Sequence, residues 1–264
     1  MMRNEKVYEM KTNQQLVESN FEEKIKVFTL AVDGEFDGNE TFSVANTRMP
    51  TDTFNTLLIK SVNVKDSYKV KQAIDCFMER GYPFSVWMDV EHMHAEWKDI
   101  LQTYNLIEAE GNVMMMRENS LHLDQKHSNQ LTITQVKNNE EFLKYVDVFM
   151  SLFEGSKEHD ALEKYFSKFS LQKLDSDVKM FVGCIDDVAI ITGLLIKTKD
   201  SYGIYDVMTK EAYRGKGLGS EMFHFLLSQT KDKEKPVVLQ ASDDGKNIYK
   251  RFGFTDVGEM LVFE

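Results

Sequence analysis

Tyr213-Arg214-Gly215-Lys216-Gly217-Leu218-Gly219-Ser220 joins a strand-like run, Tyr202 to Met208, to a segment whose apolar residues recur at helical spacing. Three glycines in a turn that opens a helix leave consecutive backbone N–H groups bare, and the helix dipole adds partial positive charge there. Arg214 and Lys216 add further positive charge. The segment therefore predicts a binding site for an anionic group such as a phosphate or pyrophosphate.

The glycine spacing decides between the known phosphate-binding turns. A dinucleotide fingerprint, G-x-G-x-x-G, fails because Ser220 or Met222 occupies its third glycine position, and no Walker A frame exists here. The frame that fits is Arg-x-x-Gly-x-Gly, read as Arg214, Gly217 and Gly219. This pattern resembles the acyl-CoA-binding loop of the GNAT superfamily of N-acetyltransferases.

A second motif follows the first in the order that this family shows. Lys235 to Ala241 reads as a short buried strand, and Ser242-Asp243-Asp244-Gly245 leads into a helix that contains Tyr249. The helix ends in Phe252-Gly253-Phe254, where Gly253 suits the left-handed position after a helix. This tail is similar to the Tyr-x-x-x-Gly-Phe signature of GNAT domains. The resemblance covers roughly residues 130 to 264.

The resemblance implies a fold and a cosubstrate. The expected fold is α+β, the GNAT fold: a mixed, mostly antiparallel sheet flanked by helices, with the cofactor in a V-shaped gap between two central strands. The expected cosubstrate is acetyl-CoA, with no metal. The residues that the resemblance assigns to the cofactor are Val207, Met208, Thr209, Arg214, Gly215, Lys216, Gly217, Leu218, Gly219 and Ser220. Among them, the Val207 N–H would polarise the thioester carbonyl.

Direct acetyl transfer to a primary amine needs a proton acceptor for the amine and a donor for the leaving thiolate. Tyr249 matches the family's general acid, and Asp206, on the candidate strand, is our candidate general base. Asp206 could equally be a surface carboxylate or a group that binds a cationic substrate. Ser242 stands where many relatives carry Asn, which puts any contact made by that amide in doubt.

Less specific interpretations of the same residues stay open. The glycines could form a flexible loop, Arg214 could be a solvated charge, and Tyr249 could be a core aromatic. A non-catalytic acyl-CoA-binding regulatory module would keep the loop without turnover. A structural interaction protein would not bind CoA at all.

The 264 residues exceed one such domain, so we expect two halves. The predicted division is a degenerate GNAT-like domain at 1–117, a linker at 118–130 and the catalytic domain at 131–264. In the first half, residues 27–31 read as a strand after a helix, residues 33–39 as a turn, and residues 55–60 and 83–88 as strands. This half has no Arg-x-x-Gly-x-Gly turn, so we expect it to be structural or to shape the acceptor site.

The composition limits the kinds of binding partner that we expect. A net charge of −11 argues against nucleic acid and leaves room for a cationic acceptor such as a polyamine, an aminoglycoside or a lysine-bearing peptide. Cys76 and Cys184 lack metal spacing, and His92 and His94 lack a third ligand in motif spacing. With no run of eighteen apolar residues and no apolar segment at residues 1–6, we expect a cytoplasmic protein without membrane partners, as a monomer or homodimer.

Overall fold

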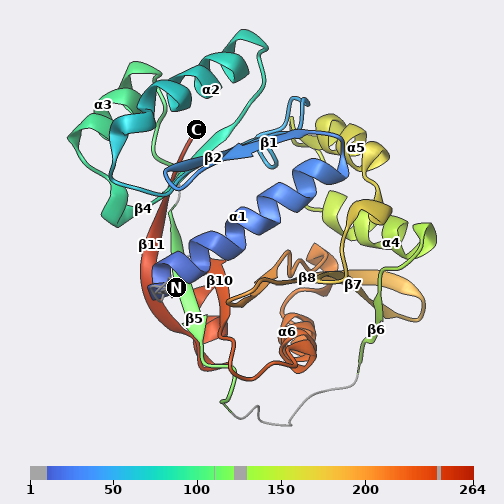
Figure 1. Ribbon diagram of the computed structural model, residues 1–264. Coiled ribbons are helices and arrows are strands. Elements are labelled where there is room, and N and C mark those ends of the chain that lie inside the picture. Colours follow the sequence, from blue (N-terminus) through green and yellow to red (C-terminus); the bar gives the residue numbers. More distant parts are fainter. Residues whose placement is uncertain (1–10, 110, 122–129, 243–244) are drawn as a thin grey trace, which may run out of the picture.

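The structure, a computed structural model, describes residues 11–109, 111–121, 130–242 and 245–264. Its strands form one mixed sheet in the order β1-β2-β3-β4-β11-β5-β10-β9-β8-β7-β6 (Figure 1). The strands are β1 (Glu35–Gly38), β2 (Phe42–Asn46), β3 (Thr56–Ile59), β4 (Ser85–Asp89), β5 (Asn112–Arg117), β6 (Thr132–Gln135), β7 (Val178–Ile185), β8 (Val188–Lys197), β9 (Tyr202–Tyr205), β10 (Val237–Ala241) and β11 (Thr255–Phe263). Pairing is antiparallel except between β3 and β4 and between β9 and β10, which confirms the α+β expectation.

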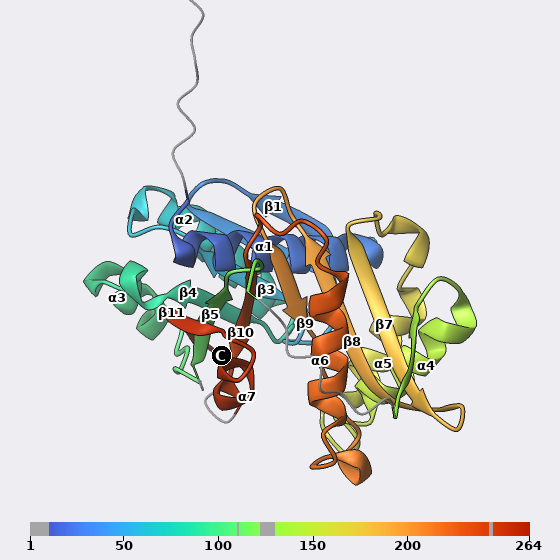
Figure 2. The ribbon, with the colours of Figure 1, turned by 90° about the horizontal axis from the view of Figure 1, so that it is seen from below.

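Helices cover both faces of the sheet. They are α1 (Asn13–Ala31), α2 (Ser67–Glu79), α3 (Ala95–Thr103), α4 (Asn139–Met150), α5 (His159–Lys168), α6 (Leu218–Gln229) and α7 (Lys246–Lys250). Leu194 on β8 packs in one core cluster with α1, α4 and α5, whereas Leu195 packs in another with α6. Since neighbouring strand residues point to opposite faces, α1 and α6 lie on opposite sides of the sheet (Figure 2).

The two halves of the chain interleave their strands at the middle of the sheet. β11, from the C-terminal half, pairs with β4 on one side and with β5 on the other. β5, from the N-terminal half, in turn separates β11 from β10. Each half therefore completes the sheet of the other, and the sheet runs without a break through both.

The two parallel strand pairs differ in how far they stay together. β3 and β4 pair along all four residues of β3, from Thr56↔Ser85 to Ile59↔Met88. β9 and β10 pair only at Val237↔Tyr202 and Val238↔Gly203 and then separate. The backbone turns away from the ladder at Asp206, whose φ is +50°. The C-terminal half thus has an open gap between its parallel strands β9 and β10. The equivalent parallel strands of the N-terminal half, β3 and β4, stay paired.

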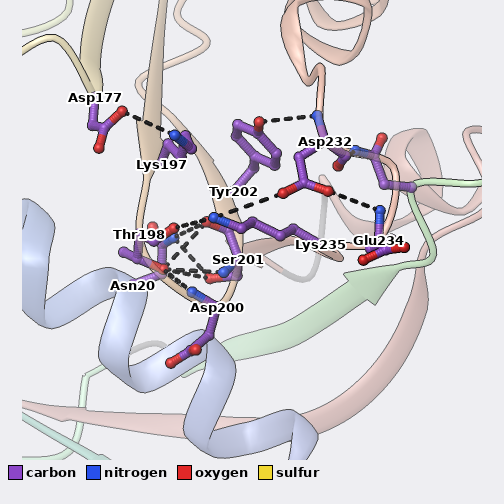
Figure 3. A network of polar contacts seen from close by, with 11 residues as sticks. Asn20, Asp177, Lys197, Thr198, Asp200, Ser201, Tyr202, Asp232, Glu234 and Lys235 are labelled. Carbon is purple, nitrogen blue, oxygen red and sulfur yellow. Dashed lines mark hydrogen bonds and ion pairs between the residues drawn. The ribbon is translucent and has the colours of Figure 1, made fainter.

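Helix α1 holds the paired end of β9 from the face opposite α6. Asn20 is fully buried; its amide Nδ2 donates to Ser201 Oγ at 2.9 Å, and its Oδ1 accepts from the Tyr205 hydroxyl at 2.9 Å. The hydroxyl of Tyr202, at the start of β9, accepts from the backbone N–H of Asp232 in the loop before β10 (Figure 3). A Cβ on Gly203 would lie 1.9 Å from Asn20 Oδ1, so only glycine fits here. The N-terminal half therefore fixes where the gap begins.

Two predictions for the N-terminal half were wrong. Residues 27–31 continue α1, because Phe28 and Ala31 extend its buried face and Thr29 bonds to Ile25 O at 2.7 Å. Part of the expected turn at 33–39 is strand β1, which pairs with β2. The hairpin between β7 and β8 turns at Asp186-Asp187, and both residues have positive φ.

The domain boundaries remain a prediction. Residues 122–129 of the expected linker, and Asp243-Asp244 before α7, lie outside the described residues. In the described parts of the chain, no helix is both long and apolar enough to cross a bilayer.

Candidate active site

The glycine segment forms a tight loop at the start of α6. Gly215 and Gly217 have φ of +74° and +82°, a region that residues with a Cβ rarely occupy. Gly217 is the N-cap of α6, and no described atom lies within 4 Å of a Cβ built on either glycine. The glycines therefore provide both the turn and open space beside its backbone.

The backbone donors at the end of this loop, where α6 begins, make no hydrogen bonds to the described residues. Between Gly217 and Ser220, no N–H donates to an acceptor among the described residues, as expected for the first turn of a helix. Arg214 Nε donates to Thr209 O at 3.1 Å, which leaves the other guanidinium nitrogens free of bonds to the described residues. Free N–H groups, a helix N-terminus and an exposed guanidinium together favour an anion here.

A cleft of about 510 Å³ opens beside the loop, and we call it the loop cleft. Of the residues expected at the cofactor, Val207, Thr209, Arg214, Gly215, Gly217, Leu218, Gly219 and Ser220 line it. Met208 and Lys216 do not: Met208 O accepts from Thr192 N at 3.0 Å, and Lys216 Nζ bonds to Ala212 O at 3.1 Å. Sequence analysis did not assign four further lining residues to the site: Tyr213, Phe223, Ile248 and Arg251.

Asp206 lies at the point where β9 leaves the ladder. Its side chain is 6% exposed, and Oδ1 accepts from Lys24 Nζ of α1 at 2.8 Å. Oδ2 accepts from the Tyr145 hydroxyl at 3.4 Å. The pKa of Tyr145 is raised well above its ordinary value, by burial first and then by the charge of Asp206, so Tyr145 stays a neutral donor. Asp206 could be placed beside the gap from the sequence because it belongs to the candidate strand. Nothing in the sequence around Lys24 indicated that it would pair with Asp206.

A second cavity of about 180 Å³ lies on the α1 face of the gap, and we call it the α1-side cavity. Six lining residues come from the C-terminal half: Ile204, Tyr205, Asp206, Val207, Gln240 and Tyr249. Four come from the N-terminal half: Phe21, Lys24, Trp87 and Asn112. Asp206, Val207 and Tyr249 were expected at the site from the sequence. Of the other seven residues, Gln240 is the one with a local signal, as a polar residue within the apolar strand β10.

Tyr249 and Val207 line both cavities. Tyr249 packs against Phe223, with ring centroids 4.9 Å apart, and its hydroxyl makes no hydrogen bond to a described residue. Burial raises the pKa of Tyr249, which keeps its proton available at neutral pH. The two cavities therefore share Tyr249, whose hydroxyl has no hydrogen-bond partner among the described residues.

A second charged cluster lies on α1, over the closed strands of the N-terminal half. Lys60, directly after β3, donates to Glu22 Oε1 at 2.6 Å, much as Lys24 of α1 pairs with Asp206 after β9. Glu18 is 4% exposed; burial raises its pKa from 4.5 to about 8, and the charge of Asp89 adds to this. Its Oε1 lies 3.4 Å from His92 Nδ1 without hydrogen-bond geometry.

His92 and His94, which the sequence analysis considered as possible metal ligands, contact different groups. His92 lies beside Glu18, and His94 bonds through Nε2 to Val62 O. Across the described residues, no group of three or more His, Cys, Asp or Glu side chains could hold a metal ion.

Comparison with known proteins agrees with this geometry. Residues 153–264 match the family model described as "Acetyltransferase (GNAT) domain". No curated protein matches the sequence significantly.

Solved structures extend the likeness to the whole chain. A GCN5-related N-acetyltransferase from Kribbella flavida matches with a TM-score of 0.65 at 11% identity, over 92% of this chain and 94% of that one. A functionally unknown conserved protein from Staphylococcus epidermidis matches with a TM-score of 0.63 at 16% identity, over 88% and 94%. A tandem GNAT protein from the clavulanic acid biosynthesis pathway matches with a TM-score of 0.55 at 8% identity, over 94% of each chain. At these identities the likeness shows a shared fold.

Proposed function

From the match of residues 153–264 to the GNAT acetyltransferase family model, we propose that the chain is an acetyl-CoA-dependent N-acetyltransferase acting on a primary amine. The observation that carries the proposal is the meeting of two cavities at Val207 and Tyr249. One cavity offers free backbone donors for a pyrophosphate, and the other leaves room for an amine. Direct transfer between two bound substrates needs this arrangement.

The residues of the loop cleft fit acetyl-CoA. Gly217 to Ser220 present free N–H groups at the start of α6, and Arg214 lies beside them. Within the sheet, β9 and β10 separate after two paired positions, so backbone groups there can bond to an extended pantetheine arm. The Val207 N–H makes no hydrogen bond to a described residue, so it can donate to the thioester oxygen as charge develops.

Two side chains handle protons in this proposal. Asp206, directly or through a water, accepts the proton that the amine loses on attack. Lys24 holds the Asp206 carboxylate in place, with its Nζ 2.8 Å from Oδ1. Tyr249 gives its proton to the departing thiolate, as its free hydroxyl and raised pKa allow. No covalent enzyme intermediate is required.

Replacing Tyr249 by phenylalanine should lower kcat about 100-fold, in the range measured for loss of a general acid, and leave acetyl-CoA affinity within about threefold. The ring stays and keeps its contact with Phe223, so the cleft keeps its shape. Release of free CoA gives kcat, and calorimetry gives the affinity. The exposed Tyr68, far along the chain in α2, provides the control Tyr68→Phe. Unchanged kcat in Tyr249→Phe would remove Tyr249 from the chemistry, and CoA binding without any turnover in the wild type would favour a regulatory module.

A further inference from the structure

We propose that the acceptor is a small monoamine with an apolar or aromatic body about the size of one ring, selected by side chains of the N-terminal half. This rests on the proposed acetyl transfer and names the substrate class of the same site. The starting observation is that the α1-side cavity is built jointly, with Phe21 and Lys24 from α1, Trp87 from β4 and Asn112 from β5.

The cavity is partly open to solvent, and its size limits the amine-bearing part of an acceptor that it can hold. At about 180 Å³ it is only slightly larger than an apolar protein cavity of about 150 Å³ that holds one benzene molecule. An aminoglycoside, with several sugar-sized rings, exceeds this volume several-fold. Helix α1 also crosses the face of the sheet on which the cavity lies (Figure 1), which obstructs an extended polypeptide. A single small molecule fits both constraints.

The walls of the cavity favour an apolar or aromatic body. The Phe21 and Trp87 rings pack against each other with centroids 4.9 Å apart, and Trp87 is held by an Nε1–H bond to Ser85 Oγ at 2.8 Å. Tyr205 also lines the cavity, and its hydroxyl is fixed by Asn20. Rigid aromatic faces of this kind bind flat or apolar groups at little cost in entropy.

The charges of the cavity favour one amine rather than several. Its cation and its anion, Lys24 and Asp206, pair with each other at 2.8 Å, so the lining is neutral overall. A polyamine would bring two or more extra positive charges into a partly desolvated, neutral site, which is unfavourable. One amine nitrogen can approach the Asp206 carboxylate and then lose its proton to it.

Two side-chain amides in the cavity are available to form hydrogen bonds with polar atoms of the acceptor. The Asn112 side chain forms no hydrogen bond with a described residue, and Gln240 Nε2 has only a weak contact, 3.5 Å from Met260 Sδ. Both amides line the α1-side cavity. A site with free amide groups discriminates strongly for ligands that satisfy them.

The test compares acceptors and variants in one assay, the release of CoA from acetyl-CoA by the full chain. The panel is 2-phenylethylamine, tyramine, spermidine, kanamycin and a lysine-bearing peptide. We expect kcat/KM for at least one arylalkyl monoamine to exceed that for each of the other three at least tenfold. Trp87→Ala and Asn112→Ala should raise the KM for that amine about tenfold, with the KM for acetyl-CoA unchanged.

Control variants distinguish a loss of acceptor selectivity from a loss of folding. Trp87→Phe keeps a ring and should restore most of the affinity for the amine, and Tyr68→Ala, an exposed aromatic of the same half, should change neither KM. A preference for the peptide, the polyamine or the aminoglycoside overturns the inference, and so does an unchanged acceptor KM in Asn112→Ala and a folded Trp87→Ala. Acetyl-CoA binding with no small monoamine turned over also overturns it. Failure to bind acetyl-CoA at all would instead overturn the proposed function.

Discussion

Gly219→Glu should weaken acetyl-CoA binding at least about 100-fold, equivalent to about 2.7 kcal/mol, while the protein stays folded. Gly219 lies in the first turn of α6, where the free N–H groups face the loop cleft. A carboxylate at this position bonds to the same donors and repels the pyrophosphate. The expected loss is large because the added carboxylate competes for the backbone donors themselves, which truncation of a neighbouring side chain leaves in place.

The surroundings of Gly219 allow this substitution without a steric clash or backbone strain. A Cβ there would meet only Thr209 Oγ1, at 3.9 Å, and Gly219 does not have the positive φ of Gly215 and Gly217. An acidic residue in the first turn of a helix is also favourable for the helix dipole, so α6 should not be destabilised. Calorimetric titration with acetyl-CoA, together with a thermal unfolding curve, measures both effects.

Gly219→Ala is the matched control. It adds the Cβ without the charge, so its affinity should stay within about threefold of wild type, because 3.9 Å is an ordinary contact. If Gly219→Glu bound acetyl-CoA as the wild type does, the start of α6 would not be the pyrophosphate site. Equal losses in both variants would point to shape rather than charge.

Glu18→Gln should make the protein more stable than wild type above pH 8, by up to roughly 4 kcal/mol. Glu18 is buried on α1 and its pKa is raised from 4.5 to about 8. Asp89 and Glu22 add to this rise, and Lys60 opposes it. Ionising Glu18 in the folded protein therefore costs free energy, and a glutamine, which cannot ionise, does not incur this cost.

The direction of the pH dependence follows from proton binding. Between about pH 4.5 and pH 8 the folded protein holds a proton on Glu18 that the unfolded chain has released, so unfolding releases a proton. The stability contributed by this proton is fully present below pH 4.5 and is lost as the pH rises to about 8. In Glu18→Gln this component is absent, so the two stability curves should diverge with rising pH.

Urea unfolding at pH 5, 7 and 9 measures the divergence. Glu23→Gln, on the same helix but with a more exposed side chain that pairs with Lys26, should keep the wild-type pH dependence. A constant difference in free energy of unfolding between wild type and Glu18→Gln at all three pH values would contradict the prediction.

The parts of the site that sequence could predict are those made by one continuous segment. The loop from Arg214 to Ser220 presents backbone N–H groups at the start of α6, so three glycines and a following helix already specify the chemistry we propose for it. The hairpin at Asp186-Asp187 was predictable for the same reason, since two residues that tolerate positive φ form the whole turn.

The α1-side cavity could not be predicted, because it is assembled from distant segments. Phe21, Trp87 and Asn112 each look like ordinary core or strand residues, and only the interleaving of β5 and β11 brings them to the gap. Local pattern also misjudged residues 27–31, where β-branched residues favour a strand but burial of Phe28 and Ala31 continues the helix. Tertiary packing overrides local preference in such short apolar runs.

The interleaved strands bear on how the chain folds during translation. Between the end of β5 and the start of β11, the ribosome must add residues 118–254, which takes roughly 7 to 27 s at 5–20 residues per second. Throughout that interval β4 and β5 have no partner on the edges that β11 will join, and these edges carry apolar residues such as Met88 and Met114. Unpaired apolar edges attract other nascent chains. The newborn protein should therefore depend on chaperones that shield both strands until residues 255–263 arrive.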